Sequence, residues 1–128
     1  MYQQATQAYQ QSANTSASAD PRALEAEALM KAAARLSVLQ REWDTVSREE
    51  RNETLIFNRT LWTIFVTEAT AEYSELPLEL QNNIANLALF MFNRTMEMMG
   101  GAEPEALETM ININKSLASG LRGQKANV

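Results

Sequence analysis

The chain has 128 residues and a net charge of -5, and it contains neither cysteine nor histidine. Their absence excludes disulfides, thiolate metal sites and histidine-dependent triads, and the length suits one domain that folds without a cofactor or cross-link. The acidic balance argues against non-specific binding to nucleic acid, which depends on lysine and arginine neutralising phosphates.

Residues 1–19 are rich in Gln, Ala, Ser and Thr, with Tyr2 and Tyr9 as the only large apolar groups. Such a segment buries too little to offset its ordering entropy, so we expect a flexible tail that orders on a partner. The alternative is a short helix packed through Tyr9 onto the rest of the chain. The first residues lack the pattern of a signal peptide, and no apolar run approaches the ~20 residues of a membrane span. We therefore expect a cytoplasmic protein without membrane insertion.

The first predicted helix covers residues 21–44 and begins at Asp20-Pro21, a capping residue followed by a proline at the first helical position. Apolar residues at three- and four-residue steps predict one buried face. The opposite face, which carries Arg22, Glu25 and Arg41, is predicted to be wet. The alanine run at 32–34 permits close approach of a neighbouring helix.

The second helix, residues 48–73, follows the capping-box spacing of Ser47 and Glu50 and ends before Pro77. It carries two adjacent apolar stripes, so neighbours must cover it on several sides. One stripe consists of Leu55, Trp62, Val66, Ala69 and Tyr73, and the other of Phe57, Leu61, Ile64 and Phe65.

The third helix, residues 77–99, runs from Pro77 to a glycine pair at 100–101, and the fourth, residues 104–121, begins at Pro104. Gly120 and Gly123 are predicted to mark the end of the fourth helix, which leaves 124–128 loose. No strand pattern is present. Short connections favour antiparallel neighbours, so the sequence predicts an all-α, up-and-down bundle of about four helices over residues 20–123, with a flexible N-terminal tail.

Asn58 and Arg59 are polar residues set between the two stripes of the second helix. Asn58 is predicted to be buried and bonded across the bundle to Asn112, Asn114 or a backbone carbonyl, which would fix the helix register. The alternative is that Arg59 and Trp62 form part of a partner-binding patch, because Arg and Trp are enriched among interface residues that carry affinity.

Methionines gather near the end of the third helix and in the fourth, at Met91, Met96, Met98, Met99 and Met110. Methionine fills irregular core gaps and also grips varied apolar surfaces. Core filling is expected for Met91 and Met98. Phe92 and Met96 lie away from the core stripe and are predicted to form a groove for another helix.

Carboxylates are the only candidates for acid–base chemistry, and none forms a convincing site. The row Glu68, Glu72 and Glu75 is typical of a solvated helix face, and no glycine-rich loop follows a strand. We therefore expect no enzymatic activity, no cofactor and no metal.

Several short motifs, in order along the chain, resemble the bacterial flagellar biosynthesis regulator FlaF family. They are Ala8-Tyr9-Gln10, Pro21-Arg22 with Glu25, Asn58-Arg59 with Leu61-Trp62, Leu76-Pro77, Leu87-Ala88, and Ile113-Asn114 with Gly120-Leu121. Together they span most of the chain, from 8 to 121. Where an aromatic residue often follows the glutamate at 25, this chain has Ala26.

The resemblance implies a protein needed for flagellin production or export, which binds flagellin as a chaperone and works with a second regulator, FlbT. It also implies that the partner segments are flagellin's terminal amphipathic helices. The alternative is a post-transcriptional regulator that contacts flagellin messenger RNA or FlbT without binding flagellin, and a third hypothesis is simple self-association.

Two sets of site residues follow from the periodicity and the resemblance together. The expected partner contacts are Tyr9, Arg59, Phe92, Met96, Met99 and Met110. The expected core and signature residues are Asn58, Leu61, Trp62, Leu87, Ala88, Asn114 and Gly120.

Overall fold

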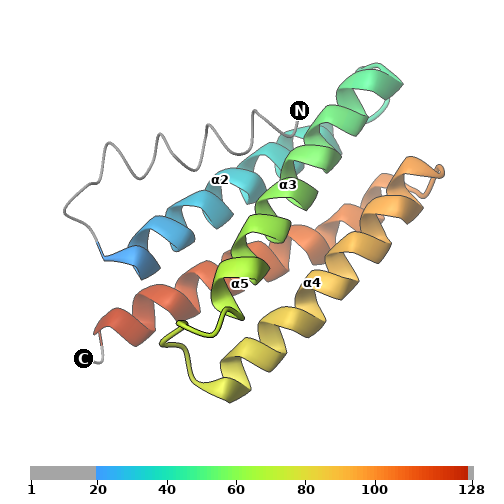
Figure 1. The fold of residues 1–128 in the computed structure, drawn as a ribbon. Helices are drawn as coiled ribbons and strands as arrows, with labels where there is room; N and C mark the ends of the chain where they lie inside the picture. The colour runs from blue at the N-terminus through green and yellow to red at the C-terminus, as the bar shows by residue number, and fades with distance from the viewer. Residues whose placement is uncertain (1–19, 127–128) are drawn as a thin grey trace.

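The computed structural model describes residues 20–126, which contain four α-helices, one short 3-10 turn and no strand. The elements are α2 (Pro21–Arg41), α3 (Arg48–Ala69), α4 (Leu78–Met99), the turn η1 (Pro104–Ala106) and α5 (Leu107–Ala126). The helices run alternately up and down (Figure 1), so the predicted all-α bundle is confirmed. The predicted tail, including Tyr9, lies outside the described residues.

The bundle is built from two closely packed helix pairs. α2 makes its most extensive contact with α5, and α3 makes its most extensive contact with α4. Small side chains allow the first pair to approach closely, because Ala26 and Ala33 of α2 and Ala118 of α5 are all fully buried. Gln40 Nε2 donates to the carbonyl of Pro104 at 3.1 Å and so ties the end of α2 to the start of the last helix.

Both predicted N-terminal caps are present. The Asp20 carboxylate accepts a hydrogen bond from the amide of Arg22 at 2.7 Å. The Ser47 hydroxyl accepts from the amide of Glu50 at 3.1 Å, and it donates to the Glu50 carboxylate at 3.3 Å. Each cap satisfies an amide that has no partner within its helix, which explains why α2 and α3 start where the sequence indicates.

The predicted ends of the first two helices are too late. α2 ends at Arg41, and α3 ends at Ala69, four residues before the predicted position. The early end of α3 lets the connection fold back, so that Leu76 is buried before the next helix begins. Tyr73, predicted to extend the apolar stripe, is therefore outside the helix and 72% exposed.

α4 ends at the glycine pair in a Schellman motif. The amide of Ala102 donates to the carbonyl of Glu97 at 3.1 Å, and that of Gly101 donates to Met98 at 3.2 Å. Gly101 has a φ of 103°, a left-handed conformation that side-chain-bearing residues adopt only with strain.

The last helix is longer than predicted. α5 continues through Gly120 and Gly123 to Ala126, so the expectation of an end near 121 and a loose segment from 124 is wrong for 124–126. Burial of Ala118 and Leu121 against the bundle stabilises this part of α5 more than the glycines weaken it.

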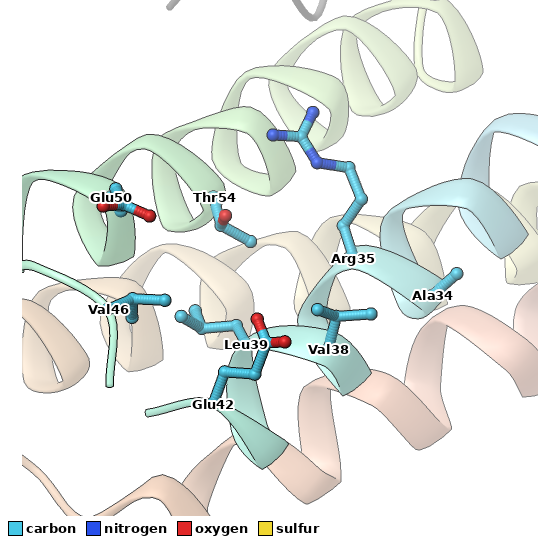
Figure 2. A pocket seen from close by; sticks show the side chains of 8 residues that line it. All are labelled: Ala34, Arg35, Val38, Leu39, Glu42, Val46, Glu50 and Thr54. Atoms are coloured by element: carbon cyan, nitrogen blue, oxygen red, sulfur yellow. The ribbon is translucent and has the colours of Figure 1, made fainter. Parts of the chain in front are cut away.

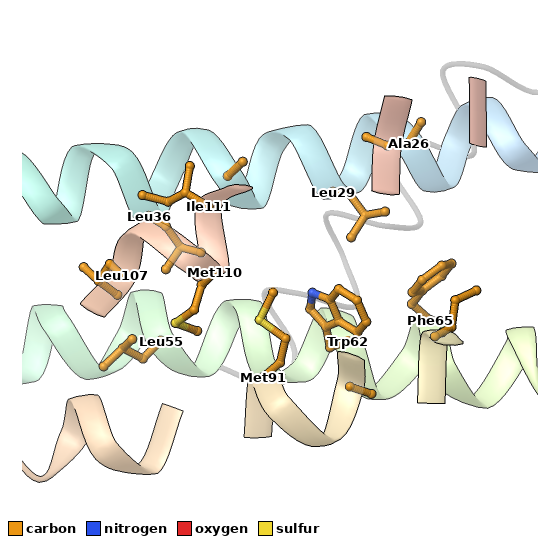
Figure 3. Packing of buried hydrophobic residues seen from close by; sticks show 14 of the residues in the cluster. Ala26, Leu29, Leu36, Leu55, Trp62, Phe65, Met91, Leu107, Met110 and Ile111 are labelled. Atoms are coloured by element: carbon orange, nitrogen blue, oxygen red, sulfur yellow. The ribbon is translucent and has the colours of Figure 1, made fainter. Parts of the chain in front are cut away.

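The core has a large and a small cluster. Figure 3 shows residues of the large cluster, where Trp62 meets Phe65 edge to face with ring centroids 5.6 Å apart. The small cluster consists of Ala28 and Ala32 of α2 with Phe57 and Leu61 of α3. The first stripe of α3 packs in the large cluster, whereas the second is shared, with Phe57 and Leu61 in the small cluster and Phe65 in the large one. The helix is therefore apolar around much of its circumference.

Candidate partner-binding surface

A buried polar network joins α3, α4 and α5 at the centre of the bundle. Asn114 Nδ2 donates to Asn58 Oδ1 at 2.9 Å, and Trp62 Nε1 donates to Asn114 Oδ1 at 2.8 Å. Asn58 Nδ2 approaches the sulfur of Met91 at 3.7 Å. All four side chains are fully buried. The expected bond between Asn58 and Asn114 is therefore present, and this network belongs to the architecture of the bundle.

The burial of Trp62 corrects one alternative from the sequence. Its side chain has no exposed surface, and its only polar atom is already bonded to Asn114. A partner cannot contact it in the folded protein. Arg59 remains half-buried on α3, without Trp62 beside it as a binding residue.

The other expected core residues divide by exposure. Leu61 and Ala88 are buried, and Leu87 is half-buried against the large cluster. Gly120 is exposed on α5, and a Cβ placed there would meet no atom within 4 Å. Its expected core role is therefore wrong, because no neighbouring backbone approaches it.

The methionine prediction is right in part. Met91 and Met98 are core residues, and Met96 is 61% exposed on α4. Met110, expected to contact a partner, is instead fully buried and lies within the cluster shown in Figure 3. The reason is its position on the α5 face that also carries Leu107 and Asn114, which points inward.

An apolar stripe runs along the outside of α4, and we call it the outer stripe. It repeats every seven residues in two rows, and its members are Leu78, Ala85, Leu89, Phe92, Met96 and Met99. The core stripe of the same helix has the same repeat, and its members are Ile84, Ala88, Met91, Thr95 and Met98. The centres of the two stripes lie about 100° apart at 100° per residue, so the outer stripe flanks the core-facing side of α4 and the bundle covers only part of it.

Exposure is greatest at Leu78, Leu89 and Met96, at 71%, 59% and 61%. These three positions lie within about 20° of one another around the helix and form one exposed row. Phe92 and Met99 are half-buried and contact the large cluster from its edge. Leu78 and Leu89 were not among the expected contacts, although Leu89 lies seven residues before Met96 and Leu78 lies fourteen, or two such repeats, before Phe92. Three large apolar side chains left exposed on one face of a well-covered bundle are typical of a binding site.

At the C-terminal end of α4, the outer stripe lies beside the first turns of α3. Met99 lines a surface hollow of about 290 Å³ together with Arg48, Arg51 and Asn52. Arg59 lies seven residues after Asn52 and so occupies the same face of α3. Arg51 is held by its Nε, which donates to the carbonyl of Trp43 at 2.9 Å, and its guanidinium stacks on the Trp43 ring. Arg48 and Arg51 thus stand beside the end of the outer stripe that Met99 forms.

A second hollow, of about 320 Å³, lies between α2 and the start of α3 (Figure 2). Val38, Leu39 and Val46 form its apolar wall, and Glu42 and Glu50 stand at its edge. The side chain of Arg35 extends toward α3, where its guanidinium lies 4.0 Å from the centre of the Phe57 ring. Burial lowers the pKa of Arg35. No local pattern indicates this hollow, because it depends on how two helices meet.

Glu25 differs from its prediction. It was expected on the wet face of the first helix, but it is 8% exposed, and among the described residues its Oε2 has no hydrogen-bond partner. Burial raises the pKa of this carboxyl, Arg22 opposes the shift, and the charges of Asp20 and Glu68 add to it. Glu25 lies three residues before Ala28 and four before Leu29, so it shares the face of these buried residues, and its expected place on the wet face was wrong.

These features describe, over residues 20–126, an all-α bundle that leaves apolar side chains of one helix exposed at its surface. A model of the family described as flagellar protein FlaF matches residues 5–121, and the chain belongs to that family. Its family places it in flagellar biosynthesis. Searches of curated proteins and of solved structures found no match. Within residues 20–126, no helix has the length and apolar content needed to cross a bilayer.

Proposed function

We propose that the protein is a flagellin-binding chaperone and regulator, without catalytic activity, that supports flagellin synthesis and export. Its outer stripe covers an amphipathic helix from a terminal segment of flagellin. The observation that carries the proposal is the exposed row Leu78, Leu89 and Met96 on a helix whose other face already packs on the core.

The dimensions of the stripe suit a helical partner. α4 has 22 residues and is therefore about 33 Å long at 1.5 Å per residue. Apolar residues at seven-residue spacing match the i, i+3, i+4, i+7 anchors of an amphipathic helix laid along a groove. Flexible methionines at 96 and 99 let the surface adapt to more than one sequence.

The charges around the stripe favour a partner with a polarised surface. The chain as a whole carries a net charge of -5, whereas Arg48 and Arg51 stand beside Met99 at one end of the stripe. A partner helix with acidic residues at that end and basic residues elsewhere would be complementary. Such complementarity fixes orientation and raises the association rate more than it raises affinity.

The test is calorimetric titration of full-length flagellin into the wild type and two charge-matched variants. Leu89→Asp places a carboxylate in the outer stripe, whereas Asn83→Asp places one on an exposed position about 120° around the same helix. We expect Leu89→Asp to weaken binding at least about tenfold and Asn83→Asp to leave it unchanged. Both variants keep the wild-type helicity, since neither position is buried.

Equal binding by the wild type and Leu89→Asp would refute the assignment of the stripe. No binding of flagellin to the wild type at micromolar concentration would refute the chaperone function itself. The same titration with FlbT tests whether that protein, rather than flagellin, is the direct partner.

A further inference from the structure

A second site is formed where the start of α2 meets the end of α3. Here a pocket of about 210 Å³ lies between the N-terminal turn of α2, the last turn of α3 and the connection to α4. Glu25, Glu68 and Glu75 all line it, with Arg22 as the only cation among its lining residues. The pocket lies apart from the outer stripe, none of whose residues lines it.

Glu25 is the unusual group of this pocket. More than nine-tenths of its surface is buried, and Oε2 meets no donor among the described residues. Within residues 20–126 the one ion pair closer than 4 Å joins Arg94 to Glu97, so Glu25 forms no direct ion pair there, and Arg22 acts on it only from a longer distance. A buried carboxylate without a donor is costly to the fold, and a donor brought by a ligand would remove that cost.

The other lining groups suit a cationic head on an apolar stem. Glu68 is already held in place, because the Tyr73 hydroxyl donates to its Oε2 at 2.8 Å. Ala69 and Leu76, both largely buried, provide apolar wall. With the three carboxylates of Glu25, Glu68 and Glu75 ionised, their charges and that of the Arg22 guanidinium sum to -2.

We propose that this pocket binds an aliphatic ammonium group, as carried by a lysine side chain of a partner polypeptide. The ammonium is compact and offers three donors, which suits a site with several carboxylates at short range. Its methylene stem packs against Ala69 and Leu76 while the charged head reaches the glutamates. This inference does not rest on flagellin being the partner.

The test is an NMR titration of the whole chain with Nα-acetyl-lysine methylamide, following the backbone amides of Ser74, Glu75 and Leu76. The matched neutral probe is Nα-acetyl-norleucine methylamide, which keeps the stem and lacks the ammonium. We expect saturable shifts with the lysine probe and at least about tenfold weaker binding of the norleucine probe. Equal binding of the two probes would overturn the proposal.

Variants test whether the Glu25 carboxylate is what binds the lysine probe. Glu25→Gln should weaken the lysine probe about tenfold, and Glu68→Gln should weaken it by a smaller factor. Glu72→Gln, which removes an exposed carboxylate outside the pocket, should bind as the wild type does. Unchanged binding by Glu25→Gln, or an equal loss in all three variants, would show that only the general negative charge attracts the probe.

A second probe separates two sources of the same chemistry. Putrescine carries the ammonium on a free diamine, whereas the lysine probe presents it from a peptide backbone. Tighter binding of the lysine probe identifies a polypeptide partner, and tighter binding of putrescine overturns that part of the proposal. Failure of either titration leaves the flagellin proposal standing, since Leu89 and Met96 lie on a different surface.

Discussion

Replacing Asn114 with alanine tests the central polar network most directly. The side chain accepts from Trp62 Nε1 at 2.8 Å and donates to Asn58 Oδ1 at 2.9 Å, and all three residues are fully buried. The substitution therefore leaves one buried donor and one buried acceptor without a partner. Each such group costs about 1–3 kcal/mol, so the two together cost about 2–6 kcal/mol, and we expect a loss in the middle of that range, about 3–5 kcal/mol, in the free energy of unfolding.

The matched control is Asn112→Ala, an exposed position two residues earlier on the same helix. Because alanine has the higher helix propensity, we expect this control to change stability by no more than about 0.5 kcal/mol. The measurement is urea unfolding followed by circular dichroism at equal protein concentration. A loss of 3–5 kcal/mol is a large share of the typical 5–15 kcal/mol for a domain, so the midpoint should move clearly.

A double-mutant cycle separates the network from simple loss of packing. If Asn58 and Asn114 act as one unit, Asn58→Ala and Asn114→Ala together should cost less than the sum of the two single changes, because the second removes a group already left without its partner. The reasoning is refuted if Asn114→Ala costs no more than Asn112→Ala, or if the two single losses add.

Two further predictions concern stability. Gly101→Ala should destabilise the chain by about 1 kcal/mol in urea unfolding, because a φ of 103° strains a residue that has a Cβ. Gly120→Ala, at an open helical position, should stabilise it by about 0.5–1 kcal/mol. Effects of the same sign in the two variants would contradict the Schellman assignment. Burial raises the pKa of Glu25 above its ordinary value of 4.5, so the folded state keeps this proton to a higher pH than the unfolded chain does. The wild type therefore loses stability as the pH rises through the folded pKa, and Glu25→Gln should be the more stable protein at pH 7, by a margin that disappears toward pH 4. A margin independent of pH, measured by unfolding from pH 4 to 8, would show that Glu25 is not desolvated.

Local rules accounted for much of the secondary structure. Asp20, Ser47 and Pro77 marked helix starts correctly, because a cap or a proline acts on the amides of its own first turn. The helix ends were less predictable. Burial of Leu76 is favoured when α3 ends early, and burial of Leu121 stabilises α5 beyond Gly120. Both depend on burial against residues distant in sequence.

The candidate surfaces show the same division. Met96 and Phe92 were identified from their distance from the core stripe, and Leu78 and Leu89 were detectable by the same seven-residue repeat. Met110 and Glu25 were placed wrongly, although helical spacing puts each on the buried face of its own helix, Met110 three residues after Leu107 and Glu25 four before Leu29. The hollow beside Val38 and the pocket around Glu25 exist only where elements meet, so no local pattern indicates them.

The sequence by itself determined the helical class, the caps, the number of helices after residue 20 and the family, because these follow from periodicity and from motifs in order along the chain. The tertiary structure decided which faces are covered. It buried Trp62, Asn58 and Asn114 in one network and left the outer stripe of α4 open, since α4 packs mainly on α3 while α2 and α5 pack on each other. Whether a helix face is buried depends on the elements that pack against it, and only the folded bundle specifies which elements these are.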